Sequence, residues 1–248
     1  MVILSLYNIK GGVGKTATAV NLSYLSTLEG AKTLVCDLDP QGSASYYFRI
    51  QSGIKSGIKT LIAGGRKIDI NIKGTDYENL DLLPSDFSFR NLDLKFHQVK
   101  KPKKRLSKSL SPKAGEYDFI FIDCPPNITL VSENVFNASD YVLVPVIPTT
   151  LSYRTYKKLI SFFKKHTFET KQIIPFFSMV EIRKKLHREM MQKMRGKYPD
   201  LLQSVIPYAS LVEQMGIYRK PVTHFRPNST AGQSYKLLWD EIKDRIFR

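Results

Sequence analysis

The chain has 248 residues, of which 42% are hydrophobic, so it can bury one sizeable core. Its formal net charge is +16, and residues 1–99 contribute only +2 of it, whereas residues 100–248 contribute +14. This asymmetry points to a polyanionic partner, either nucleic acid or an anionic membrane, although general solubility is the plainer interpretation.

Several classes of protein are disfavoured at this level. The sequence has no apolar run of about 18 residues and no basic leader with a small-residue cleavage site, so we expect a soluble cytoplasmic protein. Cys36 and Cys124 both lie in strand-like apolar runs, which indicates buried reduced thiols rather than a disulfide or metal framework.

Short apolar runs recur along the chain and alternate with stretches able to form helices. The runs occupy residues 2–8, 33–39, 80–84, 118–125, 141–147, 173–180 and 204–208. Such nearly continuous runs are typical of strands buried on both faces. The sequence therefore predicts an α/β fold: one domain over residues 1–248, with a doubly wound, mostly parallel sheet flanked by helices in three layers. The basic residues 100–113 are interpreted as a solvated helix with loops.

A glycine-rich segment, Asn8–Thr18, separates the first predicted strand from a helix that begins near Thr16. Gly14, Lys15 and Thr16 match the end of the phosphate-binding motif G-x-x-x-x-G-K-[ST], and Ile9 replaces its first glycine. In such a loop, backbone N–H groups surround the phosphates, the lysine reaches the β and γ oxygens, and the threonine hydroxyl binds Mg²⁺. The predicted nucleotide contacts are Gly11, Gly12, Val13, Gly14, Lys15, Thr16 and Ala17. A second lysine, Lys10, precedes the glycines.

Three aspartates follow predicted strands, where parallel sheets bind ligands. Asp37 and Asp39 close the second run two residues apart, on the same side of the chain. Asp123 follows four apolar residues, the position from which a Walker B aspartate holds a magnesium-bound water. One acidic residue at a strand end is often only solvated or a helix cap. Three of them together with a phosphate loop favour a magnesium nucleotide site.

The segments "KGGVGKT", "DLDPQGSAS" and "FIDCPPN" resemble, in order and spacing, the ParA/MinD family of deviant Walker A ATPases, and its ParA branch in particular. "SENVFNASDYVLVPV" and "KPVTHFRPNSTAGQSY" extend the resemblance, which is weakest over residues 95–115 and 150–205. The resemblance implies an ATP-bound homodimer in which Lys10 contacts the partner's nucleotide phosphates. It also implies that Asp39 positions the attacking water and that Asp37 and Asp123 serve the Mg²⁺ shell. Ala17 replaces a threonine common in the family, which predicts weaker nucleotide binding.

The branches of this family share a fold but differ in function. A nitrogenase-reductase type is disfavoured because Cys36 and Cys124 lie in strands. A MinD type would end in a membrane-binding amphipathic helix. Here Tyr235, Leu238, Ile242 and Ile246 form one apolar stripe with acidic residues among the polar positions, which predicts a packing helix first and membrane contact only as an alternative.

DNA is the favoured polyanion. Residues 153–165 place Tyr153, Tyr156, Leu159, Ile160 and Phe163 on one helical face and leave their basic residues toward solvent. Residues 181–197 are expected to bury Ile182, Leu186, Met190 and Met194 in the same way. Basic faces without base-reading residues suit phosphate contact. The predicted DNA contacts are Arg183, Lys184, Lys185, Arg188, Arg219 and Lys220.

The resulting hypothesis is a slow, partner-stimulated ATP hydrolase that requires Mg²⁺ and dimerises on ATP. It would bind double-stranded DNA without sequence preference, because no helix-turn-helix precedes the phosphate loop, and would associate with the nucleoid of a prokaryote. Hydrolysis, stimulated by a ParB-like or other adaptor, would release the DNA and so position a cargo. The alternatives are a MinD-like regulator that cycles on a membrane and a nucleotide-dependent binding protein with little turnover.

Overall fold

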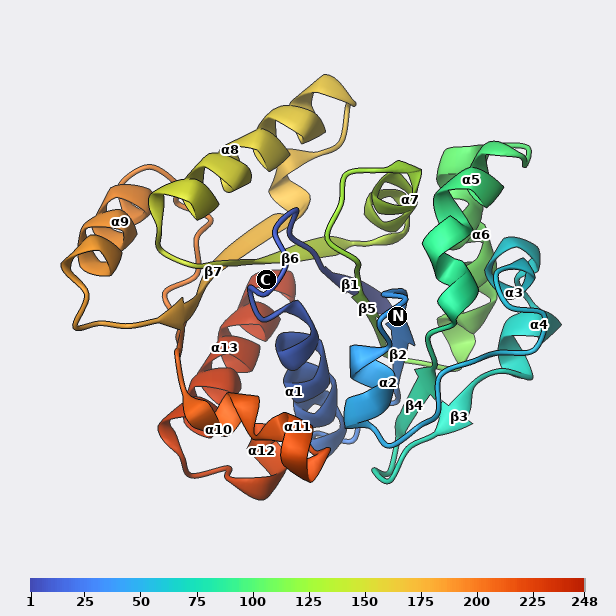
Figure 1. Cartoon of the computed structure of the whole chain (residues 1–248), viewed down its shortest axis with the longest axis horizontal. Helices are drawn as coiled ribbons and strands as arrows, with labels where there is room; N and C mark the ends of the chain where they lie inside the picture. The colour runs from blue at the N-terminus through green and yellow to red at the C-terminus, as the bar shows by residue number, and fades with distance from the viewer. Residues whose placement is uncertain (248) are drawn as a thin grey trace.

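One eight-stranded sheet runs through the chain in the order β3-β4-β2-β5-β1-β6-β7-β8. The computed structural model describes residues 1–247 (Figure 1). Among residues 1–247 only the β3–β4 pair is antiparallel, so the predicted mostly parallel sheet is confirmed. The strands are β1 Val2–Leu6, β2 Thr33–Asp37, β3 Lys73–Gly74, β4 Leu80–Leu83, β5 Phe119–Asp123, β6 Tyr141–Val146, β7 Ile173–Val180 and β8 Val205–Pro207.

The central strands are buried because helices cover both of their faces. Every residue of β2 and of β5 is buried, as expected for a parallel sheet in the middle layer. In the register, Asp123 at the end of β5 pairs with Asp37 of β2 on one side and with Leu6 of β1 on the other. The sheet therefore brings the carboxyl ends of β1, β2 and β5 to one place.

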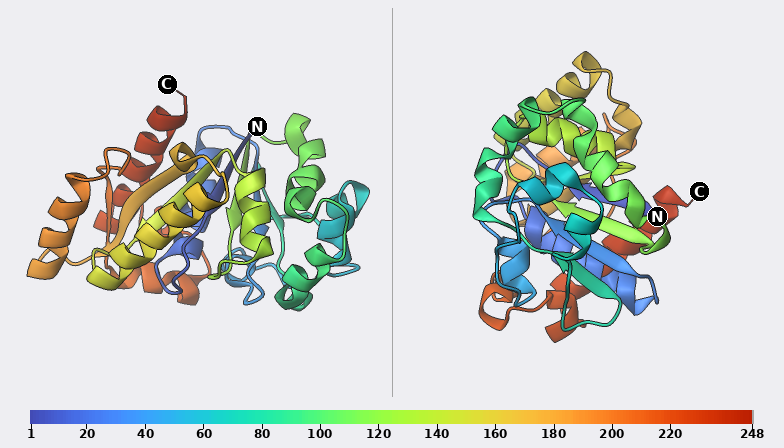
Figure 2. Two further views of the ribbon diagram at one scale, coloured as in Figure 1. Left: turned by 90° about the horizontal axis from the view of Figure 1, so that it is seen from above. Right: turned by 90° about the vertical axis from the view of Figure 1, so that its right-hand side faces the viewer.

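Two hydrophobic layers, one on each face of the sheet, complete a three-layer sandwich (Figures 1 and 2). α1 and α13 lie on one face, and α7 and α8 lie on the other. The longer helices are α1 Lys15–Leu28, α7 Leu130–Ala138, α8 Thr150–Lys165, α9 Lys185–Arg195 and α13 Thr230–Ile246. The shorter ones are α2 Ser43–Tyr47, α3 Lys59–Ala63, α4 Arg66–Asp69, α5 Leu92–His97, α6 Arg105–Leu110, α10 Ser210–Glu213, α11 Met215–Tyr218 and α12 Val222–Phe225.

Two parts of the fold differ from the sequence expectation. The edge strand β3 was not predicted, because it is only two residues long and consists of Lys73 and Gly74 without any apolar run. Residues 100–113 form short 3-10 segments around α6, and Leu106 and Leu110 are buried in the core, so this segment is only partly solvated. That residues 1–248 form one domain stays a prediction.

The apolar stripe of α13 packs against the sheet, as predicted. Tyr235, Leu238 and Ile242 are buried with Trp239, and Ile246 lies partly buried beside them. Within residues 1–247, no helix combines the length and the hydrophobicity that crossing a membrane requires.

Candidate nucleotide site and basic surfaces

The phosphate loop turns directly from β1 into α1. Gly12 and Gly14 have φ angles of 66° and 90°, in the left-handed region that favours glycine. A Cβ on Gly14 would also lie 2.9 Å from the Ser178 hydroxyl oxygen. The next residues, Lys15, Thr16 and Ala17, form the first helical turn, whose N–H groups have no intrahelical acceptor. The loop is therefore shaped to offer backbone donors to an anion.

Asn8 anchors the start of this loop, a role that the sequence did not suggest. The buried Asn8 side chain donates to the Pro145 carbonyl of β6 at 2.8 Å and accepts from the Lys10 N–H at 2.9 Å. The contact to Pro145 depends on the position of β6, so no local pattern reveals it, whereas the bond to the Lys10 N–H is a local turn of the kind that Asn commonly forms. Asn8 thereby fixes the backbone that carries Lys10.

The two lysines of the loop lie in opposite environments. Lys15 is only 7% exposed, and its Nζ lies 3.4 Å from the Lys10 carbonyl oxygen, across the loop. Burial lowers the Lys15 pKa, with nearby Asp123 opposing the change. The Lys10 side chain is exposed. Lys15 is thus confined to its own loop, whereas Lys10 is available to a second molecule.

Asp123 is a buried carboxylate whose two oxygens have no hydrogen-bond partner among the described residues. Burial raises the pKa of Asp123 well above the usual range, and the negative charge of the neighbouring Asp37 adds to the rise. The nearby Thr16 hydroxyl opposes it. A buried carboxylate is costly unless a cation or donor meets it. Mg²⁺ suits this place, because it is bound by one or two carboxylates together with phosphates rather than by a protein cage.

Asp37 and Asp39 are held by a network of two buried serines. Ser45 donates to the Asp37 carboxylate through its N–H at 2.8 Å and its hydroxyl at 2.7 Å. The Ser85 N–H donates to the Ser45 hydroxyl at 3.0 Å, and the Ser85 hydroxyl donates to the Asp39 carbonyl. Burial raises the pKa of Asp37 to about 6, although the Ser45 hydrogen bonds oppose the rise. No role for either serine was predicted from the sequence.

The remaining predicted nucleotide residues share this edge of the sheet. Gly11 and Gly12 are exposed, Gly14 and Thr16 are half-buried, and Val13 and Ala17 are buried. The Ala17 methyl packs in the apolar layer below α1, so its backbone N–H is the group left for a phosphate. The contacts themselves stay predictions.

Replacing Asp123 with asparagine is expected to stabilise the nucleotide-free protein while weakening Mg²⁺-dependent nucleotide binding. A raised carboxylate pKa favours the native state at low pH, and this contribution is lost as pH rises through the native pKa. The variant should therefore gain about 1–3 kcal/mol in unfolding free energy at pH 8, and less at pH 5. Urea unfolding checks this, with the exposed Asp76→Asn as the control. A variant less stable than wild type at pH 8 would contradict the assignment.

The buried face of one predicted basic helix is confirmed, whereas that of the other differs from the prediction. In α8, Tyr153, Tyr156, Leu159 and Phe163 are buried, and Ile160 is partly buried, as predicted. In the segment 181–197 the prediction was wrong for Ile182 and Leu186, which are 62% and 48% exposed. The reason is that residues 181–184 form a loop and α9 begins only at Lys185, so the buried face consists of His187, Met190, Met191 and Met194.

The predicted DNA contacts form two separate groups. Arg183, Lys184, Lys185 and Arg188 are exposed around the start of α9, whereas Arg219 and Lys220 are half-buried after α11. Figure 1 shows α9 and α11 at different parts of the fold. Arg188 donates to the Ile182 and Arg183 carbonyls at 2.9 and 3.0 Å, and Lys184 pairs with Glu181. Arg188 therefore also holds the loop together.

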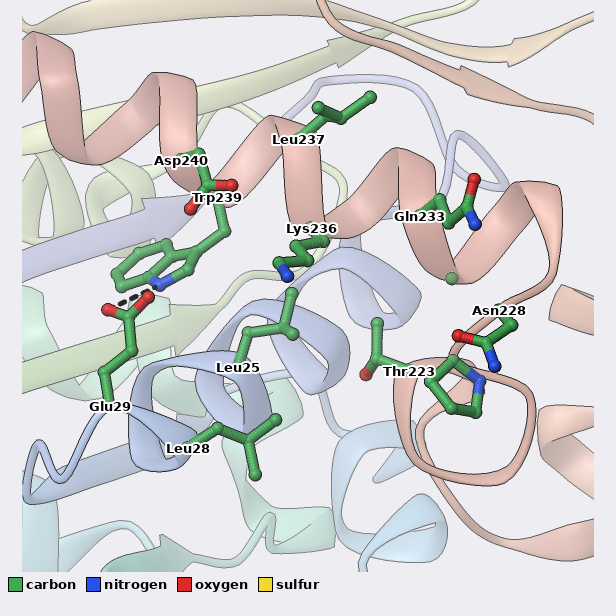
Figure 3. A pocket seen from close by; sticks show the side chains of 12 residues that line it. Leu25, Leu28, Glu29, Thr223, Asn228, Gln233, Lys236, Leu237, Trp239 and Asp240 are labelled. Carbon is green, nitrogen blue, oxygen red and sulfur yellow. Dashed lines mark hydrogen bonds between the residues drawn. The ribbon is translucent and has the colours of Figure 1, made fainter.

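A larger pocket lies away from this site, between α1 and α13 (Figure 3). Its volume is about 780 Å³, and Leu25, Leu28 and Trp239 line it together with polar residues. The Trp239 indole donates to Glu29 at its edge at 3.3 Å. None of the predicted nucleotide residues lines this pocket, so it is separate from the phosphate loop.

The doubly wound sheet, the loop between β1 and α1 and the aspartates at the ends of β2 and β5 define a P-loop nucleotide-binding protein. A sequence model of the family described as "AAA domain" matches residues 1–176, more than half of the chain. The chain belongs to this family and is a ParA-like P-loop ATPase.

Known relatives extend the similarity over nearly the whole chain. The sporulation initiation inhibitor protein Soj of Bacillus subtilis is 28% identical over 247 residues, covering 97% of each chain. A plasmid partition protein of Borrelia burgdorferi bound to AMPPNP superimposes with a TM-score of 0.82 at 23% identity, covering 99% of each chain. Cobyrinic acid a,c-diamide synthase of Mycobacterium smegmatis, with a bound ATP analogue and magnesium, gives 0.81 at 22% identity, covering 100% of this chain and 97% of the synthase. The two structures share the fold.

Proposed function

We propose that this protein is a partition-type ATPase that dimerises on Mg-ATP, binds DNA without sequence preference and releases it after hydrolysis, and so segregates or positions a cargo. The observation that carries the proposal is the pair of loop lysines, one buried over its own loop and one exposed. A phosphoryl group in transfer carries negative charge that positioned cations stabilise. An exposed lysine supplied by the second subunit makes hydrolysis depend on dimerisation.

Each polar residue of the edge has a role in this scheme. Lys15 neutralises the phosphates of its own ATP, and Lys10 reaches those of the partner. The half-buried Asp39 positions the attacking water. Thr16, Asp37 and Asp123 would hold Mg²⁺, which would supply charge neutralisation at the phosphates. One of the two fold neighbours is bound to AMPPNP, and the other is bound to an ATP analogue and magnesium.

The partners follow from the charge distribution and the relatives. The names of several relatives describe chromosome or plasmid partition, which supports a homodimer that works with DNA and a ParB-like or other stimulating adaptor. A nucleoid-associated protein of the cytoplasm fits the basic half of residues 100–248. Residues 1–248 would act as one ATPase domain.

The buried stripe of α13 favours DNA over a membrane-cycling function. Tyr235, Leu238 and Ile242 pack in the core, so inserting them into a bilayer would expose the layer beneath α1. Gel shifts with a duplex of arbitrary sequence, run in ATP and in ADP and compared with sedimentation on anionic liposomes, test this choice. DNA binding only with ATP is expected. Liposome binding without DNA binding would favour the membrane alternative.

Reversing the charge at Arg183 and Lys185 should weaken DNA binding about equally for all sequences. Both side chains are exposed, and neither supports the loop as Arg188 does. For the double glutamate variant, affinity should fall by about 10-fold or more, and the slope of log affinity against log salt should decrease by about 0.9 per lost phosphate contact.

The matched control is Lys59→Glu with Lys67→Glu, the same charge change on exposed lysines of α3 and α4 at the far end of the sheet. Fluorescence anisotropy over a salt series measures both variants. An equal loss in the control would mean that only net charge matters, and the α9 site would be refuted.

A further inference from the structure

The short helices α2 and α11 are fastened together by a reciprocal pair of arginine contacts. Arg219 Nε donates to the Tyr46 carbonyl at 2.9 Å, and its guanidinium lies 4.5 Å from the centre of the Tyr46 ring. Arg49 in turn donates to the Tyr218 carbonyl at 3.3 Å. We call this arrangement the α2–α11 clasp.

Both arginines hold an unfavourable backbone conformation at the end of their helix. Arg49 and Arg219 have φ angles of 61° and 50°, in the left-handed region that non-glycine residues rarely adopt. Such conformations persist where surrounding contacts fix them. The Arg49 N–H donates to the Tyr46 carbonyl at 3.1 Å and the Arg219 N–H to the Met215 carbonyl at 2.8 Å, and the clasp contacts add to these backbone bonds in holding the two helix ends together.

The clasp is one residue away from the nucleotide site. Ser45, which donates twice to the Asp37 carboxylate, directly precedes Tyr46 in α2. Asp37 thus holds α2 in place, and the carbonyl and ring of Tyr46 in α2 hold Arg219.

A second connection joins the segment after α11 to the phosphate-loop helix. The buried Asn21 of α1 donates to the Ala17 carbonyl at 2.7 Å and accepts from the N–H and the hydroxyl of Thr223 at 3.0 and 2.9 Å. The segment that carries Arg219 is therefore bonded on both sides to elements of the nucleotide site.

The clasp leaves Arg219 ready to bind a phosphate. Only its Nε is used, and within residues 1–247 its terminal N–H groups have no hydrogen bond or ion pair. A planar guanidinium with free terminal donors suits a phosphate oxygen pair. Arg49, in contrast, is paired with Asp76 at 3.4 Å.

We propose that the α2–α11 clasp transmits the state of the Asp37 site to Arg219, so that Tyr46 and Arg49 are positioning residues for a DNA phosphate contact. The inference rests on the proposed DNA function of Arg219. Coupling of this kind requires an element whose position both sites influence, and α2 with α11 is that element.

The experiment compares Arg49→Ala with Asp76→Ala, and Tyr46→Ala with Tyr46→Phe. Asp76→Ala removes only the ion pair of Arg49, and Tyr46→Phe keeps the ring below Arg219, so both controls should behave as wild type. Arg49→Ala and Tyr46→Ala should keep their ATP affinity but lose about 10-fold in duplex affinity in the ATP state. Fluorescence anisotropy with an arbitrary duplex measures this loss.

Hydrogen exchange without DNA is the second readout. In wild type, Mg-ATP should change the protection of residues 215–220, and this change should be absent in Arg49→Ala and Tyr46→Ala. An unchanged nucleotide response in both variants would overturn the clasp. If Arg219→Ala bound DNA normally, the DNA role of Arg219 would fail, whereas the exchange result would still decide whether the clasp couples the helices to the nucleotide site.

Discussion

Replacing Lys15 with alanine is expected to lower ATP affinity by about 100-fold, the size of losing charge-assisted hydrogen bonds to two phosphates. Lys15 is the buried cation of the loop, and its Nζ already lies within the loop at 3.4 Å from the Lys10 carbonyl. The fold should tolerate the change, because burial lowers the Lys15 pKa and the ammonium therefore does not gain stability from its surroundings. Isothermal calorimetry with Mg-ATP measures the loss.

The control is Lys32→Ala, which removes an exposed lysine outside the site. Its affinity should equal that of wild type. Urea unfolding of both variants without nucleotide shows whether the fold is intact. If folded Lys15→Ala bound ATP as wild type does, the phosphate loop would be wrongly assigned.

The parts of the site that sequence predicts are those governed by local geometry or by a rule of the sheet. Gly12 and Gly14 indicate a loop from the sequence, because their positive φ angles are easily adopted only by glycine. Asp37 and Asp123 could be placed together because parallel strands end at the same edge, and the register pairs them.

The missed parts depend on contacts between segments distant in sequence. Asn8 acts through the Pro145 carbonyl, 137 residues away, and Ser85 acts through Asp39, 46 residues away. The error at Ile182 has a different origin, since helical spacing was applied to residues that precede the first turn of α9. Periodicity fixes a buried face only where the helix boundary is known.

Lys10→Ala and Asp39→Ala are each expected to reduce ATP turnover by about 100-fold or more, for different reasons. Lys10 is exposed and should leave monomer ATP affinity unchanged when removed, because its target belongs to the partner. Asp39 acts on the water, so Asp39→Ala should form the ATP dimer and retain it. Light scattering in Mg-ATP, together with phosphate release, separates the two defects. An Asp39→Ala protein that binds Mg-ATP but remains monomeric would contradict these roles.

Mixing the two inactive variants tests whether Lys10 acts across the interface. In a mixed dimer, the Lys10→Ala subunit keeps its own Asp39 and receives Lys10 from its partner, so one of the two sites is complete. Random association of equal amounts makes half of the dimers mixed, and turnover should recover to about one quarter of the wild-type rate. The variants must be combined without nucleotide, because the Asp39→Ala dimer is expected to persist once ATP is added. If Lys10 served the nucleotide of its own chain, each site of the mixed dimer would lack one of the two groups, and mixing would restore no activity.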